Sequence, residues 1–129
     1  MSMRRLGLAG AALAMLALGM VSAVAQRTVS WGAIAYGPKG SAWSSAYGEN
    51  SAEDANQKAL ALCARRSDDC QVVASFSNTC AAVAVIQSTH ATFVATDAKR
   101  GNAEAQARQA CLQQNSRECR VAASACAQP

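Results

Sequence analysis

The six cysteines are the most reactive side chains in this sequence, and their spacing bears on whether they bind metal or form disulfides. Cys63 and Cys70 are separated by six residues, and Cys111 and Cys119 by seven. Zinc sites built from thiolates usually use closer pairs, with about two to four residues between ligands. An even number of cysteines in a small exported domain is typical of disulfides. The spacing therefore favours three disulfides over a zinc site.

His90 is the single histidine, and it is the first candidate for a general base or a metal ligand. A hydrolytic triad would combine it with a serine and an aspartate such as Asp97. The sequence lacks the nucleophile-elbow pattern that would order such a set. We interpret His90 as a solvated residue in or beside a hairpin turn, and the sequence predicts no catalytic residue.

Two other polar clusters are explained by turns. Asp68 and Asp69 could serve acid–base chemistry or bind calcium, but adjacent residues point in divergent directions and further oxygen ligands are not evident. Residues 37–40, Gly-Pro-Lys-Gly, lack the spacing of a phosphate-binding loop. They indicate a hairpin turn that exposes Lys39. No metal or cofactor is expected.

Aromatic side chains are concentrated in one segment. Trp31, Tyr36, Trp43 and Tyr47 fall within a predicted first hairpin, whereas the corresponding part of the second half offers Phe93. Tryptophan and tyrosine are favoured at protein interfaces. The alternative is that they fill the core, and period-two alternation puts Trp31 and Tyr36 on opposite faces of a strand. With Lys39, these four aromatic residues are the candidate partner-binding residues.

The residues between these groups predict the first of two similar units. Trp31–Tyr36 and residues 41–47 are short extended runs around a turn, which indicates a β-hairpin. A helix follows, with Ser51 as its N-cap and Arg65 and Arg66 in its last turn. Its predicted buried face consists of Ala55, Ala59, Leu62 and Cys63, and residues 70–76 form the closing strand.

The second unit repeats this order. Residues 81–86 and 90–96 match the two hairpin strands, Asn102 is the expected cap of the second helix, and residues 120–125 form the closing strand. The predicted helix face consists of Ala103, Ala107, Ala110 and Cys111, each 48 positions after its counterpart. The sequence thus predicts an α+β fold: a duplicated β-β-α-β unit with two helices packed on mainly antiparallel sheet.

The duplication suggests how the cysteines pair. Fifteen pairings are possible, and equivalent bonds in the two units would be Cys63–Cys70 and Cys111–Cys119. Cys80 and Cys126 remain, and a bond between them would link one unit to the other. Alanine makes up 24 of the 104 residues after position 25 and buries little area, so covalent links are the expected compensation for a thin core.

The N-terminal residues predict export. Arg4 and Arg5 precede an apolar run from 6 to 21, and residues 23–25, Ala-Val-Ala, match a signal-peptidase site. We expect residues 1–25 to be removed, leaving a single domain over 26–129 with repeats at about 30–80 and 81–126. No second apolar stretch follows, so no stable membrane insertion is expected after cleavage. The remaining net charge of +2 is spread along the chain and does not favour nucleic acid.

One family resemblance covers nearly all of residues 26–129. It is carried by residues 31–36 (Trp-Gly-Ala-Ile-Ala-Tyr), by the helix that ends in Cys63, and by residues 80–84 (Cys-Ala-Ala-Val-Ala). These features resemble domain of unknown function family 4189. The resemblance implies a small, exported, cysteine-rich bacterial protein, and some members resemble immunity proteins encoded beside secreted antibacterial effectors. No catalytic residue is established for the family, so the resemblance assigns none.

Together these features predict a monomeric periplasmic or secreted protein that binds another exported protein and is not an enzyme. The sharper form of this hypothesis is an immunity-type inhibitor of a secreted antibacterial effector. The alternative is a secreted effector or envelope factor that acts on a host or competitor. A hydrolase with a shallow site around His90 is the least favoured hypothesis.

Overall fold

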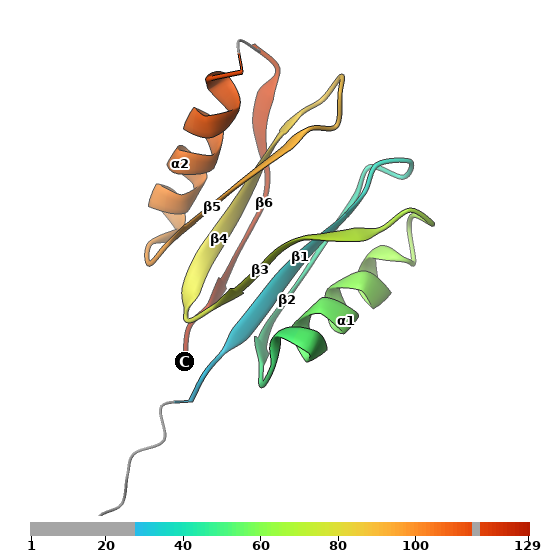
Figure 1. Cartoon of the computed structure of the whole chain (residues 1–129). Helices are drawn as coiled ribbons and strands as arrows, with labels where there is room; N and C mark the ends of the chain where they lie inside the picture. Colours follow the sequence, from blue (N-terminus) through green and yellow to red (C-terminus); the bar gives the residue numbers. More distant parts are fainter. Residues whose placement is uncertain (1–27, 115–116) are drawn as a thin grey trace, which may run out of the picture.

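The computed structural model describes residues 28–114 and 117–129, in which a β-β-α-β order occurs twice (Figure 1). The first unit contains β1 (Trp31–Gly37), β2 (Ala42–Glu49), α1 (Ala52–Cys63) and β3 (Gln71–Ser77). The second contains β4 (Thr79–Ile86), β5 (Thr92–Asp97), α2 (Arg100–Leu112) and β6 (Cys119–Ala127). The predicted signal peptide, residues 1–25, lies outside the described residues.

Each unit forms its own three-stranded antiparallel sheet with its first strand in the centre. β1 lies between β2 and β3, and β4 lies between β5 and β6. The sheets stack face to face and each carries its helix on the outer side, so the layers are α1, first sheet, second sheet and α2 (Figure 1). In the stack β2 contacts β6, and β3 contacts β4 and β5. The predicted α+β class and element order are confirmed.

The first helix begins as the sequence predicts but buries a narrower face. The Ser51 side chain accepts a hydrogen bond from the Asp54 amide at 3.1 Å, which confirms it as the N-cap. Ala55, Ala59 and Cys63, spaced four residues apart, are fully buried. The prediction that Leu62 belongs to this face is wrong, because its side chain is 40% exposed. Leu60, on the other side of the row formed by these three residues, is partly buried and packs against the core instead.

Two predictions about helix ends are also corrected. Arg65 and Arg66 lie beyond α1, because the chain turns after Cys63 and the Ser67 amide bonds back to the Cys63 carbonyl at 3.1 Å. Asn102 is not the cap of α2, which begins at Arg100 without a side-chain cap bond. The Asp97 carboxylate serves this helix start instead, since it accepts from the Lys99 amide at 2.9 Å and from the Asn102 side chain at 3.3 Å. The bond from the Lys99 amide is the main reason that the pKa of Asp97 is lowered.

The core consists of three thin layers made largely of alanine. The layer under α1 and the layer under α2 are built almost entirely from alanine and cysteine, whereas the layer between the sheets contains the bulkier side chains. That middle layer comprises Ile34, Ala74, Phe76, Ala81, Val83, Ala125 and Ala127. Gly32 lies against it, and the ring of Phe76 occupies the space that a side chain at position 32 would need.

Three disulfides join the cysteines in the expected pairs: Cys63–Cys70, Cys80–Cys126 and Cys111–Cys119. The first and third connect the end of a helix to the start of the closing strand. Cys80 belongs to β4 and faces Cys126 across the β4–β6 pair, with their Cα atoms 3.9 Å apart. The expectation that this bond links the two units is therefore wrong, because it joins neighbouring strands of the second sheet.

The disulfides also bear on the environment of the protein. Three disulfides in a domain of this size indicate an oxidising, extracellular compartment. Neither described helix has the length and apolar character that crossing a membrane requires.

We expect the three disulfides to contribute unequally to stability. Replacing Cys80 and Cys126 together by alanine should lower the free energy of unfolding by about 4 kcal/mol, and the same change at Cys63 and Cys70 by about 2.5 kcal/mol, because the first pair closes the longer loop. Urea denaturation of the two double variants measures the difference. Equal losses, or a larger loss for the short loop, would contradict the ranking.

The close packing around Gly32 predicts that adding a single methyl group there lowers the stability of the protein. A Cβ at position 32 would lie 2.6 Å from the Phe76 ring and 3.1 Å from the Ala127 Cβ, so Gly32→Ala should destabilise the protein by about 1–3 kcal/mol. Gly101→Ala is the matched control, since a Cβ there meets nothing within 4 Å and lies in the first turn of α2. That control should leave stability unchanged or raise it by up to about 1 kcal/mol. Thermal denaturation of both variants tests the contrast.

Candidate functional site

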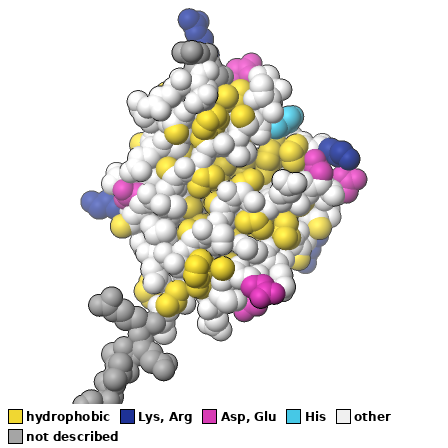
Figure 2. Space-filling model, in the orientation of Figure 1, with side chains coloured by type: hydrophobic (Ala, Val, Ile, Leu, Met, Phe, Trp, Pro, Cys, Tyr) yellow, Lys and Arg dark blue, Asp and Glu magenta, His cyan; other side chains and the backbone are white. Residues whose placement is uncertain are grey.

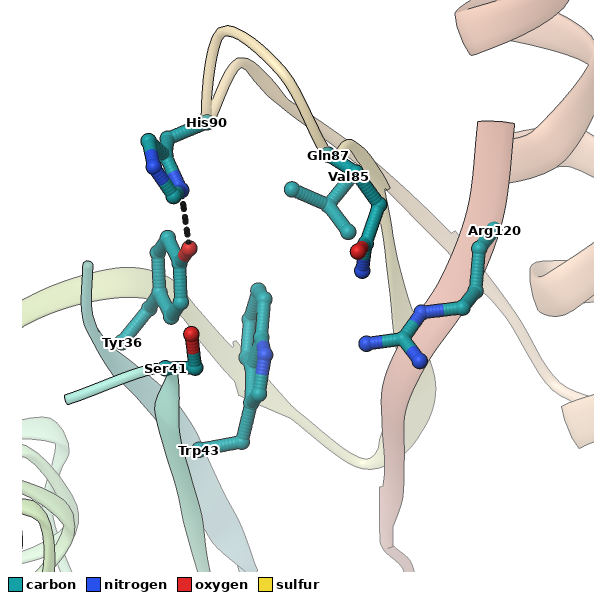
Figure 3. A pocket seen from close by; sticks show the side chains of 7 residues that line it. All are labelled: Tyr36, Ser41, Trp43, Val85, Gln87, His90 and Arg120. Carbon is teal, nitrogen blue, oxygen red and sulfur yellow. Dashed lines mark hydrogen bonds between the residues drawn. The ribbon is translucent and has the colours of Figure 1, made fainter. Parts of the chain in front are cut away.

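The two hairpin turns, one from each unit, lie at the same end of the molecule (Figure 1). Tyr36 lies near the end of β1, and His90 lies in the turn between β4 and β5. The Tyr36 hydroxyl and His90 Nδ1 are 2.7 Å apart and share a hydrogen bond (Figure 3). This bond joins residues 54 positions apart in the sequence and links β1 of the first unit to the β4–β5 turn of the second.

The surroundings of Tyr36 shift its pKa. Burial, and after it the charge of Asp69, raises the pKa of Tyr36 above its ordinary value, while Arg120 acts in the opposite direction. The phenol therefore keeps its proton at neutral pH. Which of Tyr36 and His90 donates in their hydrogen bond depends on the tautomer of the His90 ring.

Trp43 supports Tyr36 from the neighbouring strand. The two residues are register partners in β1 and β2, and their rings stack with centroids 4.1 Å apart and planes inclined by 15°. Trp43 also packs against the layer between the sheets. A stacked aromatic pair contributes about 0.5–1.5 kcal/mol beyond the area it buries, which makes this a rigid wall.

The backbone of both turns is unusual at equivalent positions. Ser41 lies directly before β2, and His90 lies in the short segment before β5. Both have positive φ angles, 45° for Ser41 and 59° for His90. Glycine is the usual residue in this left-handed region, although histidine is tolerated better than most. His90 holds this conformation while its ring bonds to Tyr36.

A small hollow of about 30 Å³ lies beside the stacked rings (Figure 3). Its lining residues are Tyr36, Ser41, Trp43, Val85, Gln87, His90 and Arg120. With the Gln87 amide oriented so that its oxygen faces the guanidinium, Arg120 donates two hydrogen bonds to it, at 2.9 and 3.1 Å. We name this space the Arg120 hollow.

A second hollow, of about 280 Å³, shares Tyr36 and His90 with the first, so this pair forms a partition between them. Its other lining residues are Pro38, Asp69, Gln71, Val73 and Thr92. Asp69 accepts from the Ser67 hydroxyl and from the Lys39 amide, and the Ser67 bond is the main cause of its lowered pKa. We name this space the Asp69 hollow. The two hollows thus contain groups of opposite charge.

Strand register shows that the two hollows are lined by equivalent positions, with each hollow taking residues from both units. Tyr36 pairs with Trp43 and Gln71, and in the second sheet Val85 pairs with Thr92 and Arg120. Trp43 therefore corresponds to Thr92, and Gln71 to Arg120. One hollow contains the tryptophan and the arginine, and the other contains their threonine and glutamine counterparts. The β-β-α-β order, which occurs twice, thus produces two similar places whose side chains differ in chemistry.

The five predicted partner-binding residues do not form one surface. Tyr36, Lys39 and Trp43 lie at the turn end, where Lys39 is exposed and pairs with Asp68 at 3.6 Å. Tyr36 is only 5% exposed and contributes to the wall of the hollows. Trp31 and Tyr47 lie toward the opposite end of the first sheet, Trp31 half-buried under α1 and Tyr47 65% exposed.

The structure leaves His90 exposed beside its turn, as the sequence suggests, and adds a contact that the sequence does not show. Its side chain is hydrogen-bonded to the other unit, although the residue as a whole is exposed (Figure 2). Asp97, its hypothetical triad partner, lies at the far end of β5, paired with Cys80, and bonds to the start of α2. Within residues 28–114 and 117–129, no three histidine, cysteine or acidic side chains are grouped to hold a metal ion.

Sequence reasoning missed Ser41, Gln87 and Arg120. Gln87 and Arg120 carry no local signal, because their meeting depends on the pairing of β4 with β6. The equivalence of Ser41 and His90 was available from the repeat, since each is 49 positions from the other in matching turns.

Comparisons with known proteins agree with this fold. The NMR structure of Rv1813c from Mycobacterium tuberculosis has a TM-score of 0.52 and 22% sequence identity, over 97% of this chain and 99% of that one. At this identity the likeness shows the fold alone. A comparison with curated proteins gives no match. The family described as Domain of unknown function (DUF4189) matches residues 31–126, and the chain belongs to that family.

Proposed function

We propose that this protein is exported and acts as a non-enzymatic binding protein that contacts another exported protein. Its contact surface is the hairpin-tip surface, which we define as residues 38–41 and 87–90 together with Arg120. The observation that carries the proposal is the hydrogen bond between Tyr36 and His90, which links β1 of the first unit to the β4–β5 turn of the second.

The exposed side chains of this surface suit recognition of a protein. Lys39, Gln87, His90 and Arg120 are all exposed, and the Tyr36–Trp43 stack lies beneath them. Figure 2 shows the histidine at the surface with acidic and basic side chains on the same edge of the molecule. Arginine and aromatic residues are enriched where interfaces are tightest, and an adjacent polar rim is typical.

The sheets that carry the two turns are held rigidly. Both turns extend from sheets whose closing strands are fixed by disulfides to the preceding helices. A surface that is already ordered loses less conformational entropy when it binds. The arrangement therefore favours tight binding by a small monomer.

The sharper form of the proposal is an immunity-type inhibitor that occludes a secreted antibacterial effector, as the family resemblance suggests. In that case the protein is retained in the periplasm with its target. Accumulation in the culture medium without a bound partner would favour the alternative, a secreted effector or envelope factor.

Site-specific photocrosslinking tests the contact surface. The full-length chain, expressed in its own host, would carry a photoreactive residue in place of Lys39 or Ser88, one in each turn. We expect both positions to crosslink to the same exported protein. In a purified complex, Lys39→Glu should weaken binding roughly tenfold, because it reverses a charge at the interface.

The controls are exposed helix positions on either side of the molecule. Crosslinkers at Glu53 of α1 and Arg108 of α2 should give no product, and Arg108→Glu should not change affinity. Crosslinks that form only from the helices, or a Lys39→Glu variant that binds as tightly as the unchanged protein, would show that the contact surface is elsewhere. Trp43→Ala is a poorer probe, since Trp43 also packs in the core.

A further inference from the structure

The Arg120 hollow has the chemistry of an anion site. Its seven lining residues include an arginine, a histidine, a serine and a glutamine, and none of the seven is acidic. Figure 3 shows Arg120 extending from β6 toward the hollow, opposite the Trp43 ring. Two acidic side chains lie nearby without lining this hollow. Asp69 lines the other hollow, beyond the partition formed by Tyr36 and His90, and Glu118 accepts a hydrogen bond from the Ser88 amide at 3.3 Å.

The guanidinium is held in place and still has donors to offer. Gln87 accepts one bond from Nε and one from an Nη, which orients the guanidinium plane. A guanidinium has about five N–H donors in all, so roughly three remain for a ligand. Arginine with a fixed plane is well suited to a carboxylate, since two parallel hydrogen bonds match the two oxygens.

The size of the hollow limits what enters. Its volume of about 30 Å³ is room for roughly two water molecules. A carboxylate is planar and presents two oxygen atoms to the fixed guanidinium, whereas a tetrahedral phosphate is bulkier and brings four oxygen atoms to the same small space. The aromatic wall of Trp43 and Tyr36 shields one side from water, which strengthens a charge-assisted hydrogen bond.

We infer that the Arg120 hollow binds a carboxylate, with Arg120 as the charged donor, Gln87 as its positioning residue, and Ser41 as a flanking donor. This inference rests on the proposed function, because we assign the carboxylate to the protein partner. It is either an acidic side chain or the C-terminal carboxylate of that partner.

An NMR titration with acetate tests the site without any partner. We expect saturable shifts of the Trp43 indole N–H, the Arg120 Nε–H and the His90 ring signals in the oxidised protein. Arg120→Gln should weaken acetate binding at least tenfold, and Gln87→Ala should weaken it severalfold while the charge is kept. Arg108→Gln, an exposed arginine on α2, is the matched control and should bind acetate as the unchanged protein does.

Two blocked peptides distinguish the sources of the carboxylate. One carries an aspartate side chain and an amidated C-terminus, and the other has no acidic side chain and a free C-terminus. The inference predicts that at least one of them competes with acetate. Inorganic phosphate should bind more weakly than acetate, and tighter phosphate binding would overturn the size argument.

Failure of this inference is distinguishable from failure of the proposed function. Shifts that do not saturate, or equal affinity in the Arg120→Gln and Arg108→Gln variants, would overturn the carboxylate site. Crosslinking from Lys39 and Ser88 would be unaffected by that result, because neither residue lines the Arg120 hollow.

Discussion

The close approach of two alanine-faced helices to their sheets is the constraint on which the rest of this structure depends. Ala55, Ala59, Ala103 and Ala107 have no exposed surface, and Cys63 and Cys111 continue the same four-residue spacing. Small side chains let a helix pack closely against a sheet. Each of them buries little apolar area, however, and burial stabilises a protein by about 25 cal/mol per Å². The cysteine at the end of each stripe extends the buried face and links it covalently to the closing strand. The disulfides are therefore part of the core.

The layer between the sheets places the two hairpin turns together. Ile34, Phe76 and Val83 supply most of its bulk, and Gly32 makes room for the Phe76 ring. Cys80–Cys126 lies within the second sheet, at the end of β4 away from the turns, so no disulfide crosses between the sheets. The apolar layer holds the sheets together, and at the turn end the Tyr36–His90 hydrogen bond joins them. The candidate site exists only because these non-covalent contacts bring the two units together.

Local patterns predicted the elements, and tertiary contacts explain what they missed. Turn residues, the Ser51 cap and the paired cysteines gave the β-β-α-β order. Asn102 was wrong as a cap because the Asp97 carboxylate, from the preceding strand, serves that helix start. His90 looked like a solvated turn residue because the sequence does not show that another turn lies beside it. Arg120 and Gln87 meet through strand pairing, which leaves no signature at either position.

The candidate site is built mainly on strands. Tyr36 and Trp43 are register partners in the first sheet, and Arg120 is on β6 of the second sheet, which the layer between the sheets holds against the first. Sites on strands are held more precisely than sites on loops. Gln87 and His90 lie at the β4–β5 turn, where they line the edge of the same hollow. The rigid strand residues therefore define the charge and the aromatic wall, whereas the turn residues complete the contact. The alanine layers under the two helices contain none of these residues, so the side chains of the candidate site can change without altering the layers that hold the fold together.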